Sequence, residues 1–167
     1  MKHLYLVRHA KSSWSDTSLP DFDRPLNDRG KKDAPEMARR LMKRIKTPDL
    51  FLSSPAKRAK KTCKIFCEEF GVNENKIVYA DKLYHASVQT FYDVLSELDK
   101  DIKSVILFSH NPGITDFAGS LCEGVSITDM PTCSIFAVKI KIKDWQELVT
   151  GEKEFDFFDY PKLTPEL

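Results

Sequence analysis

The sequence lacks a dominant charge. Its 26 Lys and Arg residues and 25 Asp and Glu residues leave a formal net charge of +1. Proteins that bind nucleic acid through its phosphates usually carry a broad basic surface. We therefore expect no nucleic-acid partner, while a local basic pocket remains compatible with this balance.

Long apolar segments are also missing. No segment approaches the ~18 consecutive apolar residues that a membrane span needs. The chain begins with a strand-like segment and not with a basic region followed by an apolar one. These absences predict no membrane association and a cytoplasmic location.

The cysteines do not have the spacing of a metal site. Cys63, Cys67, Cys122 and Cys133 form no CxxC pair. Cys63 and Cys67 stand on one face of an expected helix, where free cysteines behave as small core residues. We therefore predict no bound metal and no disulfide framework.

Length and composition are those of one globular domain. The 167 residues, 41% of them hydrophobic, can bury a substantial core. The chain has no internal repeats and no low-complexity segments. We expect a single domain over residues 1–167.

Short apolar segments rich in β-forming residues predict strands, and helical spacing of apolar residues predicts the helices between them. The expected strands cover about residues 3–7, 50–52, 76–80, 105–108, 134–142 and 154–158, and the helices about 28–45, 55–70, 88–98 and 114–121. Asn27 and Ser87 are suitable N-caps, and Gly71 can end the second helix. Pro35 disturbs the first helix, which either kinks there or begins its regular part near Asp33.

The order of these elements predicts the fold class. Alternating strands and helices are typical of a mostly parallel sheet with helices on both faces, and the last two strands are suited to antiparallel pairing. We expect a three-layer α/β/α sandwich around a mixed sheet of about six strands. Residues 11–27 are polar, contain two prolines and predict a long loop over the site.

An Arg-His pair follows the first predicted strand. Arg8 and His9 stand at its carboxyl end, where open α/β sheets bind ligands. An imidazole can act as a nucleophile, and a guanidinium is a fixed cation suited to phosphate oxygens. The pair favours phosphoryl transfer to a histidine. The alternative is that Arg8 pairs with a carboxylate and His9 is solvated.

Two further strand-to-helix junctions carry similar residues. Arg58 follows the second strand and His110 follows the fourth. Because parallel strands end at the same edge of a sheet, these residues should join Arg8 and His9 in a cationic pocket for a phosphoryl group. The helix after Pro55 would add its positive end.

Three segments resemble the signatures of a known family. They are residues 6–12 (LVRHAKS), 53–62 (SSPAKRAKKT) and 109–112 (SHNP), and they resemble the histidine phosphatase superfamily, which has the phosphoglycerate mutase-like fold. The small size and the segments at 24–30 and 83–86 resemble the short phosphohistidine phosphatases of the SixA type.

The resemblance implies roles for individual residues. His9 would be the phosphorylated nucleophile, while Arg8, Arg58 and His110 would hold the phosphoryl oxygens. Ser15 stands where mutase-type members have a phosphate-contacting asparagine, so Ser15 is a candidate for substrate binding. Asn111, in the third signature, is another. The resemblance implies no cofactor.

Two positions depart from the family pattern. Ala10 stands where the wider superfamily usually has glycine. His85 stands where mutase-type members have an acidic glutamate, so the usual carboxylic acid is missing. Nearby carboxylates at Asp81, Asp16 and Asp116 are more typical of helix caps or surface groups than of proton donors.

The resemblance implies a metal-independent phosphatase that works through a phosphohistidine intermediate. The short form lacks the helical insertion that covers the site in longer members, and an open pocket suits phosphohistidine carried on a protein. Two alternatives remain at this stage. One is a phosphomonoesterase for a small metabolite, and the other is a catalytically silent phosphate-binding module.

Overall fold

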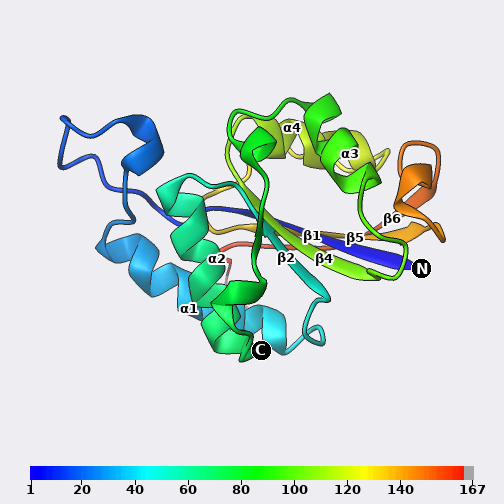
Figure 1. Cartoon of the computed structure of the whole chain (residues 1–167), viewed down its shortest axis with the longest axis horizontal. Coiled ribbons are helices and arrows are strands. Elements are labelled where there is room, and N and C mark those ends of the chain that lie inside the picture. Colours follow the sequence, from blue (N-terminus) through cyan, green and yellow to red (C-terminus); the bar gives the residue numbers. More distant parts are fainter. Residues whose placement is uncertain (164–167) are drawn as a thin grey trace.

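The computed structural model describes residues 1–163 and contains one sheet between two pairs of helices (Figure 1). The strands are β1 (Lys2–Arg8), β2 (Leu50–Ser53), β3 (Val78–Tyr79), β4 (Ser104–Ser109), β5 (Ile135–Lys141) and β6 (Glu152–Asp159). The helices are α1 (Asp28–Met42), α2 (Lys57–Phe70), α3 (Val88–Ser96) and α4 (Gly113–Leu121).

The sheet has the strand order β3-β2-β4-β1-β5-β6. The first four strands in this order are parallel, whereas β5 runs antiparallel to both β1 and β6. The expected mostly parallel, mixed sheet of six strands is confirmed. The carboxyl ends of β1, β2 and β4 therefore lie side by side at one edge.

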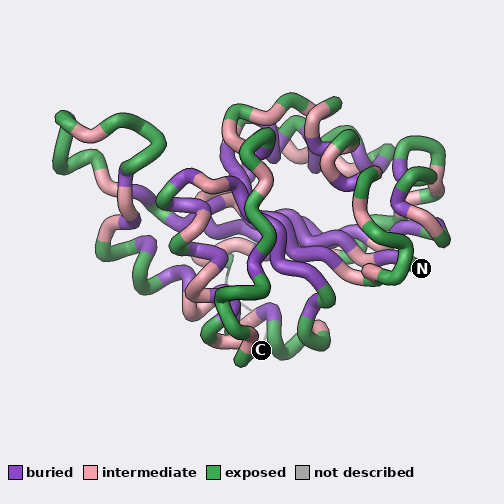
Figure 2. Tube along the Cα trace, viewed as in Figure 1, coloured by how far each residue is buried: buried purple, intermediate pink, exposed green. Residues whose placement is uncertain are grey.

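The four central strands β1, β2, β4 and β5 are buried on both faces, because their side chains alternate and helices cover each side of the sheet (Figure 2). In β1, Leu4 and Leu6 join the core under α3 and α4. Tyr5 and Val7 face the other way and join the core under α1 and α2. Cys63 and Cys67 are buried in this second core, as expected of small apolar side chains.

Two prolines are placed differently from the sequence expectations. Helix α1 starts at Asp28 and runs through Pro35, so the alternative of a regular part beginning near Asp33 is wrong. The Asn27 cap, which accepts the Gly30 amide at 2.8 Å, stabilises this earlier start. Helix α2 starts at Lys57, which leaves Pro55 before the helix and not in its first turn.

Strand β3 is shorter than the 76–80 range predicted for it. A 3₁₀ turn occupies Glu74–Lys76, and only Val78–Tyr79 pair with β2. The N-cap at Ser87 and the left-handed C-cap at Gly71 are confirmed. Within residues 1–163, no helix is long and apolar enough to cross a membrane.

Helix α4 starts in close contact with the segment that follows β3. A Cβ atom on Gly113 would lie 2.1 Å from the Ala86 carbonyl oxygen and 3.2 Å from Cε2 of Phe91. Only glycine allows this approach, which holds the segment around His85 against the start of α4.

We predict opposite effects for alanine at the two glycines of α4. Gly113→Ala should lower the free energy of unfolding by about 1–3 kcal/mol, because the backbone must move to admit the methyl group. Gly119→Ala is the matched control, since its Cβ would meet only the Ile127 carbonyl oxygen at 3.8 Å. It should raise stability by up to about 1 kcal/mol through helix propensity. Urea unfolding measures both, and equal stability of the two variants would contradict this packing.

Candidate active site

The carboxyl ends of β1, β2 and β4 are joined by backbone hydrogen bonds. The His9 amide donates to the Ser109 carbonyl at 3.1 Å, and the Ser54 amide donates to the Phe108 carbonyl at 2.9 Å. Arg8 is in register with Ser109 across β1 and β4. The polar residues that follow these strands are therefore held against one another.

A cavity of about 580 Å³ opens at this edge of the sheet. Its lining contains Arg8, His9, Arg58 and His110, which the sequence analysis expected to converge. The other lining residues are Lys11, Ser12, Trp14, Asp21, Arg24, His85, Asn111 and Thr132. Basic side chains outnumber the single carboxylate, so the cavity is suited to an anion.

His9 is buried and held in one tautomer. Its Nδ1 lies 2.7 Å from the Ala10 carbonyl oxygen, which can only accept, so Nδ1 carries the proton. Burial lowers the pKa of His9 to about 3. The hydrogen bond to Ala10 acts in the opposite direction, whereas the charges of Arg58 and Arg8 lower the pKa further. At neutral pH the ring is uncharged, and Nε2 keeps its lone pair.

His110 is the second buried imidazole. Its ring centroid lies 5.3 Å from that of His9, and its Nε2 lies 2.6 Å from the Ser54 hydroxyl. Burial, followed by the charges of His9 and Arg58, lowers the pKa of His110 to about 2. When Ser54 donates to Nε2, the proton of the neutral ring is on Nδ1, which has no partner among residues 1–163.

The two arginines also have unused donors. The Nε atoms of Arg8 and Arg58 are buried without a hydrogen-bond partner in the described part of the chain. One terminal nitrogen of Arg8 donates to the Met130 carbonyl at 2.7 Å, which orients its guanidinium. Buried donors without a partner are rare in folded proteins, and a bound anion would satisfy these.

Asp21 is a site residue that the sequence analysis missed. Its backbone carbonyl accepts a hydrogen bond from one terminal nitrogen of Arg58 at 2.7 Å, and its carboxylate accepts one from the other terminal nitrogen at 3.0 Å. Tyr84 and Arg24 also donate to this carboxylate. Burial would raise the pKa of Asp21, but the Tyr84 hydrogen bond and the two arginines lower it well below its usual value. The carboxylate is therefore ionised and is paired with Arg58.

Arg24 was also missed as a site residue. It is buried, lies over the Trp14 ring at 3.6 Å and donates to the Ser12 hydroxyl at 2.7 Å. Arg24 begins the segment at 24–30 that resembles the SixA type, and the spacing of Asp21 and Arg24 inside a long polar loop is the second sequence signal that could have pointed to them. That signal is weak, because such pairs are common on surfaces.

The remaining site residues predicted from the sequence divide into those that line the cavity and those that do not. His85 and Asn111 line the cavity, and Asn111 donates to Asp129 at 2.7 Å. His85 is exposed and has a left-handed backbone, with φ of 59°. Ser15 is exposed, bonds to Ser13 and is not part of the lining. The acid candidates Asp81, Asp16 and Asp116 do not line it either.

Within residues 1–163, no group of three or more His, Cys, Asp or Glu side chains is arranged to hold a metal ion.

Comparison with known proteins gives the family. Residues 4–84 match the model of the histidine phosphatase superfamily (branch 1). An uncharacterized chloroplastic protein of Arabidopsis thaliana is 32% identical over 154 residues, covering 87% of this chain and 70% of that one. The chain belongs to the histidine phosphatase superfamily. The signature segments around Arg8, His9 and Arg58 lie inside the matched residues.

Two further relatives show the range of this superfamily. A crystal structure from Agrobacterium tumefaciens, assigned as the phosphohistidine phosphatase SixA, has a TM-score of 0.80 and 27% identity, and the match covers 96% of this chain and 98% of that one. A phosphoglycerate mutase of Schizosaccharomyces pombe is 33% identical over 100 residues, 59% of this chain and 46% of the mutase. The fold is therefore the phosphoglycerate mutase-like fold.

The buried histidines predict a dependence of stability on pH. Between about pH 3 and 6.5 the unfolded chain binds protons at His9 and His110 that the folded protein does not bind, so stability falls as the pH drops. From pH 7 to 5 this loss is at most about 2 kcal/mol for each histidine. His9→Asn should therefore lose less stability than the parent over this range.

Urea unfolding at pH 7 and pH 5, followed by circular dichroism, measures the difference. His85→Asn is the control, because its imidazole is exposed, and it should retain the parent's pH dependence. An unchanged pH dependence in His9→Asn would show that His9 is not buried in its neutral form.

Proposed function

We propose that this protein is a phosphatase that removes the phosphoryl group from phosphohistidine on proteins, with His9 as nucleophile. The observation that carries the proposal is the neutral His9 with its free Nε2 lone pair, which lines one cavity with Arg8, Arg58 and His110. Each of these three residues has a buried side-chain nitrogen without a hydrogen-bond partner among residues 1–163. A site that only bound phosphate would have no use for that lone pair. This argues against a silent binding module.

The reaction proceeds in two displacements at phosphorus. In the first, His9 Nε2 forms a bond to phosphorus while the bond to the substrate's imidazole nitrogen breaks, and the substrate ring, already protonated on its other nitrogen, leaves as neutral imidazole. The Ala10 carbonyl keeps the proton on Nδ1 of His9 and so fixes the ring orientation. In the second, water attacks phosphorus, the bond to His9 breaks, His9 returns to its neutral form and the phosphate product carries both protons of the water.

Arg8, Arg58 and His110 stabilise the charge on the phosphoryl oxygens. Hydrogen bonds to Met130 and Ser54 hold Arg8 and His110 in place before the substrate arrives, so these two residues need little reorganisation in the transition state. Arg58 becomes available when the phosphoryl group replaces the Asp21 carboxylate. Asp21 can move aside because its side chain is 44% exposed.

The choice of substrate rests on the absence of a protonated carboxylic acid in the cavity. An alkyl phosphate must expel an alkoxide, and acid catalysis of such a step contributes ~10²–10⁴-fold. The only carboxylate in the lining is Asp21, which the neighbouring arginines and Tyr84 keep ionised. A phosphohistidine expels an imidazole with a free pKa near ~6.5, and this leaving group needs far less help.

The rim of the cavity also supports a protein-borne substrate. Trp14 lines the cavity and is 72% exposed, and the exposed His85 lines it from the segment before α3. An exposed aromatic side chain beside a reactive site is typical of a surface that contacts another protein. The similarity to the structure assigned as SixA agrees with this class of substrate.

A second candidate is a phosphomonoesterase for a small metabolite. The identity with a phosphoglycerate mutase and the cavity of about 580 Å³, which is large enough for a small ligand, favour it. The ionised state of Asp21 argues against it, because no other acid lies in the lining.

We predict that His9 carries the phosphoryl group during turnover. Acid-labile label should appear on His9 when the enzyme is quenched during turnover of ³²P-labelled phosphohistidine, and peptide mapping locates it. His9→Ala should form no label and lose at least ~10³-fold in kcat, because covalent catalysis is lost. Label on another residue, or retained activity in His9→Ala, would remove His9 from this role.

We also predict a strong order among substrates. The kcat/KM should be highest for phosphohistidine, intermediate for p-nitrophenyl phosphate and lowest for an alkyl phosphate, because the leaving groups require increasing acid assistance in that order. His85→Ala and Asp21→Asn should change kcat on phosphohistidine by less than about threefold, since neither supplies a proton. Steady-state kinetics on the three substrates measures this.

Two results would favour the metabolite phosphatase instead. One is equal efficiency on alkyl phosphate and phosphohistidine. The other is a loss of ~100-fold on both substrates in Asp21→Asn or His85→Ala, which would identify an acid.

A further inference from the structure

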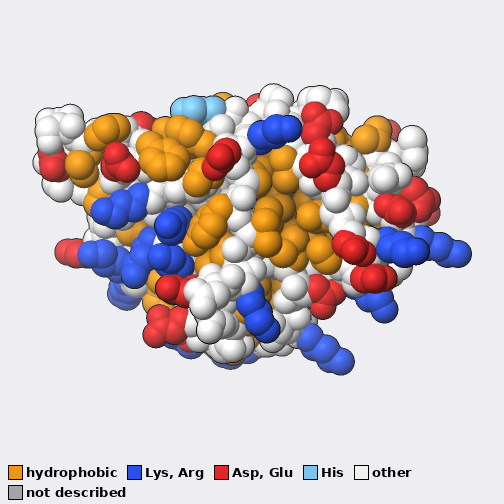
Figure 3. Space-filling model, in the orientation of Figure 1, with side chains coloured by type: hydrophobic (Ala, Val, Ile, Leu, Met, Phe, Trp, Pro, Cys, Tyr) orange, Lys and Arg blue, Asp and Glu red, His pale blue; other side chains and the backbone are white. Residues whose placement is uncertain are grey.

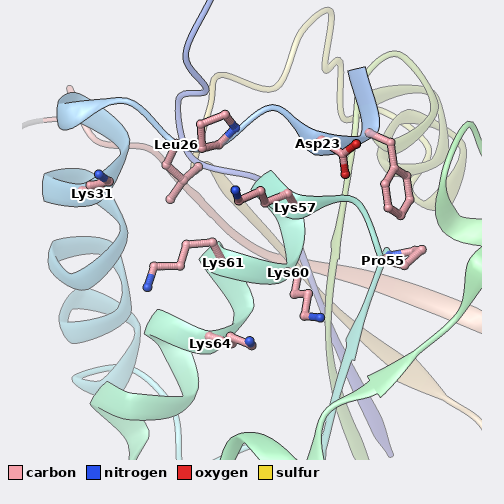
Figure 4. Close-up of a pocket in the computed structure, with 10 residues that line it drawn as sticks. Asp23, Leu26, Lys31, Pro55, Lys57, Lys60, Lys61 and Lys64 are labelled. Atoms are coloured by element: carbon pink, nitrogen blue, oxygen red, sulfur yellow. The ribbon is translucent and has the colours of Figure 1, made fainter. Parts of the chain in front are cut away.

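A second hollow lies on the other side of the turn that carries Asp21. It has a volume of about 620 Å³ and is open to solvent between α1 and α2 (Figure 4). We call it the lysine groove, because its lining contains Lys31, Lys57, Lys60, Lys61 and Lys64. The one acidic side chain in the lining is Asp23, so positive charge dominates.

The positions of the groove lysines are electrostatically unfavourable for helix α2. Lys57, Lys60, Lys61 and Lys64 follow the i, i+3, i+4, i+7 spacing of one helix face, starting at the first residue of α2. Like charges at this spacing repel, and the start of a helix favours anions. Lys31 extends from α1 on the opposite side (Figure 4).

Neighbouring carboxylates do not neutralise this charge. Within residues 1–163, none of the five lysines forms an ion pair. Lys60 lies over the Tyr79 ring at 5.2 Å, which leaves its charge uncompensated. In contrast, two arginines of α1 are paired. Arg39 forms an ion pair with Glu69, and Arg40 forms ion pairs with Glu36 and Asp159. The groove therefore presents free positive charge to solvent.

The lysine groove and the active site share one wall. Asp21 lines the active site, and the next two residues, Phe22 and Asp23, line the groove. The Phe22 ring packs edge-on against Tyr84 at 5.1 Å, and the Tyr84 hydroxyl donates to Asp21 at 2.7 Å. A protein substrate with its phosphoryl group at His9 could therefore extend across this turn into the groove.

We propose that the lysine groove binds an acidic segment of the phosphoprotein substrate, close in sequence to its phosphohistidine. This proposal rests on the proposed function and adds how the protein substrate is selected. The carboxylates of the segment would lie among the lysines, and its apolar parts would contact Phe22, which lines the groove and is 38% exposed. Charge complementarity of this kind determines specificity and association rate more than affinity.

The charge distribution favours a protein segment over a nucleic acid. Lys and Arg side chains form a cluster at the α2 end of the face in Figure 3, and acidic side chains border this cluster and are scattered over the remainder of that face. The net charge is +1. A nucleic acid would meet repulsion soon after leaving the groove, while a short acidic segment fits within it.

The test compares two synthetic peptides, each phosphorylated on its single histidine with phosphoramidate. One has four glutamates flanking the histidine, and the other has glutamines at those positions. The groove variant is the full-length triple substitution Lys57→Gln, Lys61→Gln and Lys64→Gln. The matched control is Lys46→Gln, Lys100→Gln and Lys143→Gln, which removes the same charge from exposed positions at the opposite edge of the sheet.

The parent enzyme should have a kcat/KM about tenfold higher for the glutamate peptide at low salt, since several modest ion pairs add together. This ratio should approach one in the groove variant and remain in the control. Added salt of ~0.5 M should reduce it in the parent, because exposed charges are screened. Activity on p-nitrophenyl phosphate should be equal in all three proteins.

Three results would overturn the proposal. Equal efficiency of the parent on both peptides would exclude the acidic segment and leave the proposed function intact. Hydrolysis of p-nitrophenyl phosphate without hydrolysis of either peptide would reject the proposed function, and the groove's assignment with it. Stronger inhibition by an oligothymidylate than by polyglutamate of equal charge, lost in the groove variant, would assign the groove to nucleic acid.

Discussion

Burial of His9 beside Arg8 and Arg58 is the constraint on which the chemistry of this protein depends. An exposed imidazole would be partly protonated near neutral pH and would then lack the lone pair that attacks phosphorus. Loss of water and the two nearby cations both disfavour the charged ring, so Nε2 remains free. Under the proposed function the same cations would attract the phosphoryl group, so that one arrangement would serve both nucleophile and substrate.

Hydrogen bonds to the backbone of Arg8, His9 and Ala10 hold His9 in this buried position. The Cys133 amide donates to the carbonyls of both Arg8 and His9 at 3.0 Å. The Ala10 amide donates to the Thr62 hydroxyl, which in turn donates to the Arg58 carbonyl at 2.8 Å. Helix α2 is thereby tied to the end of β1. The positions of His9 and Arg58 are therefore coupled through the Thr62 side chain.

The turn around Asp21 gives the site a second property. Its carboxylate compensates the charge of Arg58 and Arg24 while no substrate is bound, at a position that a phosphoryl group would take over. The turn also separates the active site from the lysine groove. A protein substrate that displaces Asp21 from Arg58 would contact both sides of this turn, so selection of the protein and binding of its phosphoryl group take place at adjacent surfaces.

The sequence by itself determined the layered fold and the edge of the sheet that carries the site. Alternating apolar strands and amphipathic helices admit few arrangements, and parallel strands bring residues such as His9 and His110 to one edge. Boundaries that depend on local competition, such as the short β3 and the helix through Pro35, required the structure. The ionised Asp21 and the burial of Arg24 were decided by tertiary contacts alone, because Asp21 meets Arg58 across 37 residues of sequence. Only the folded chain sets how much water and how many charges surround a group, and these determine whether a carboxylate or an imidazole carries its proton.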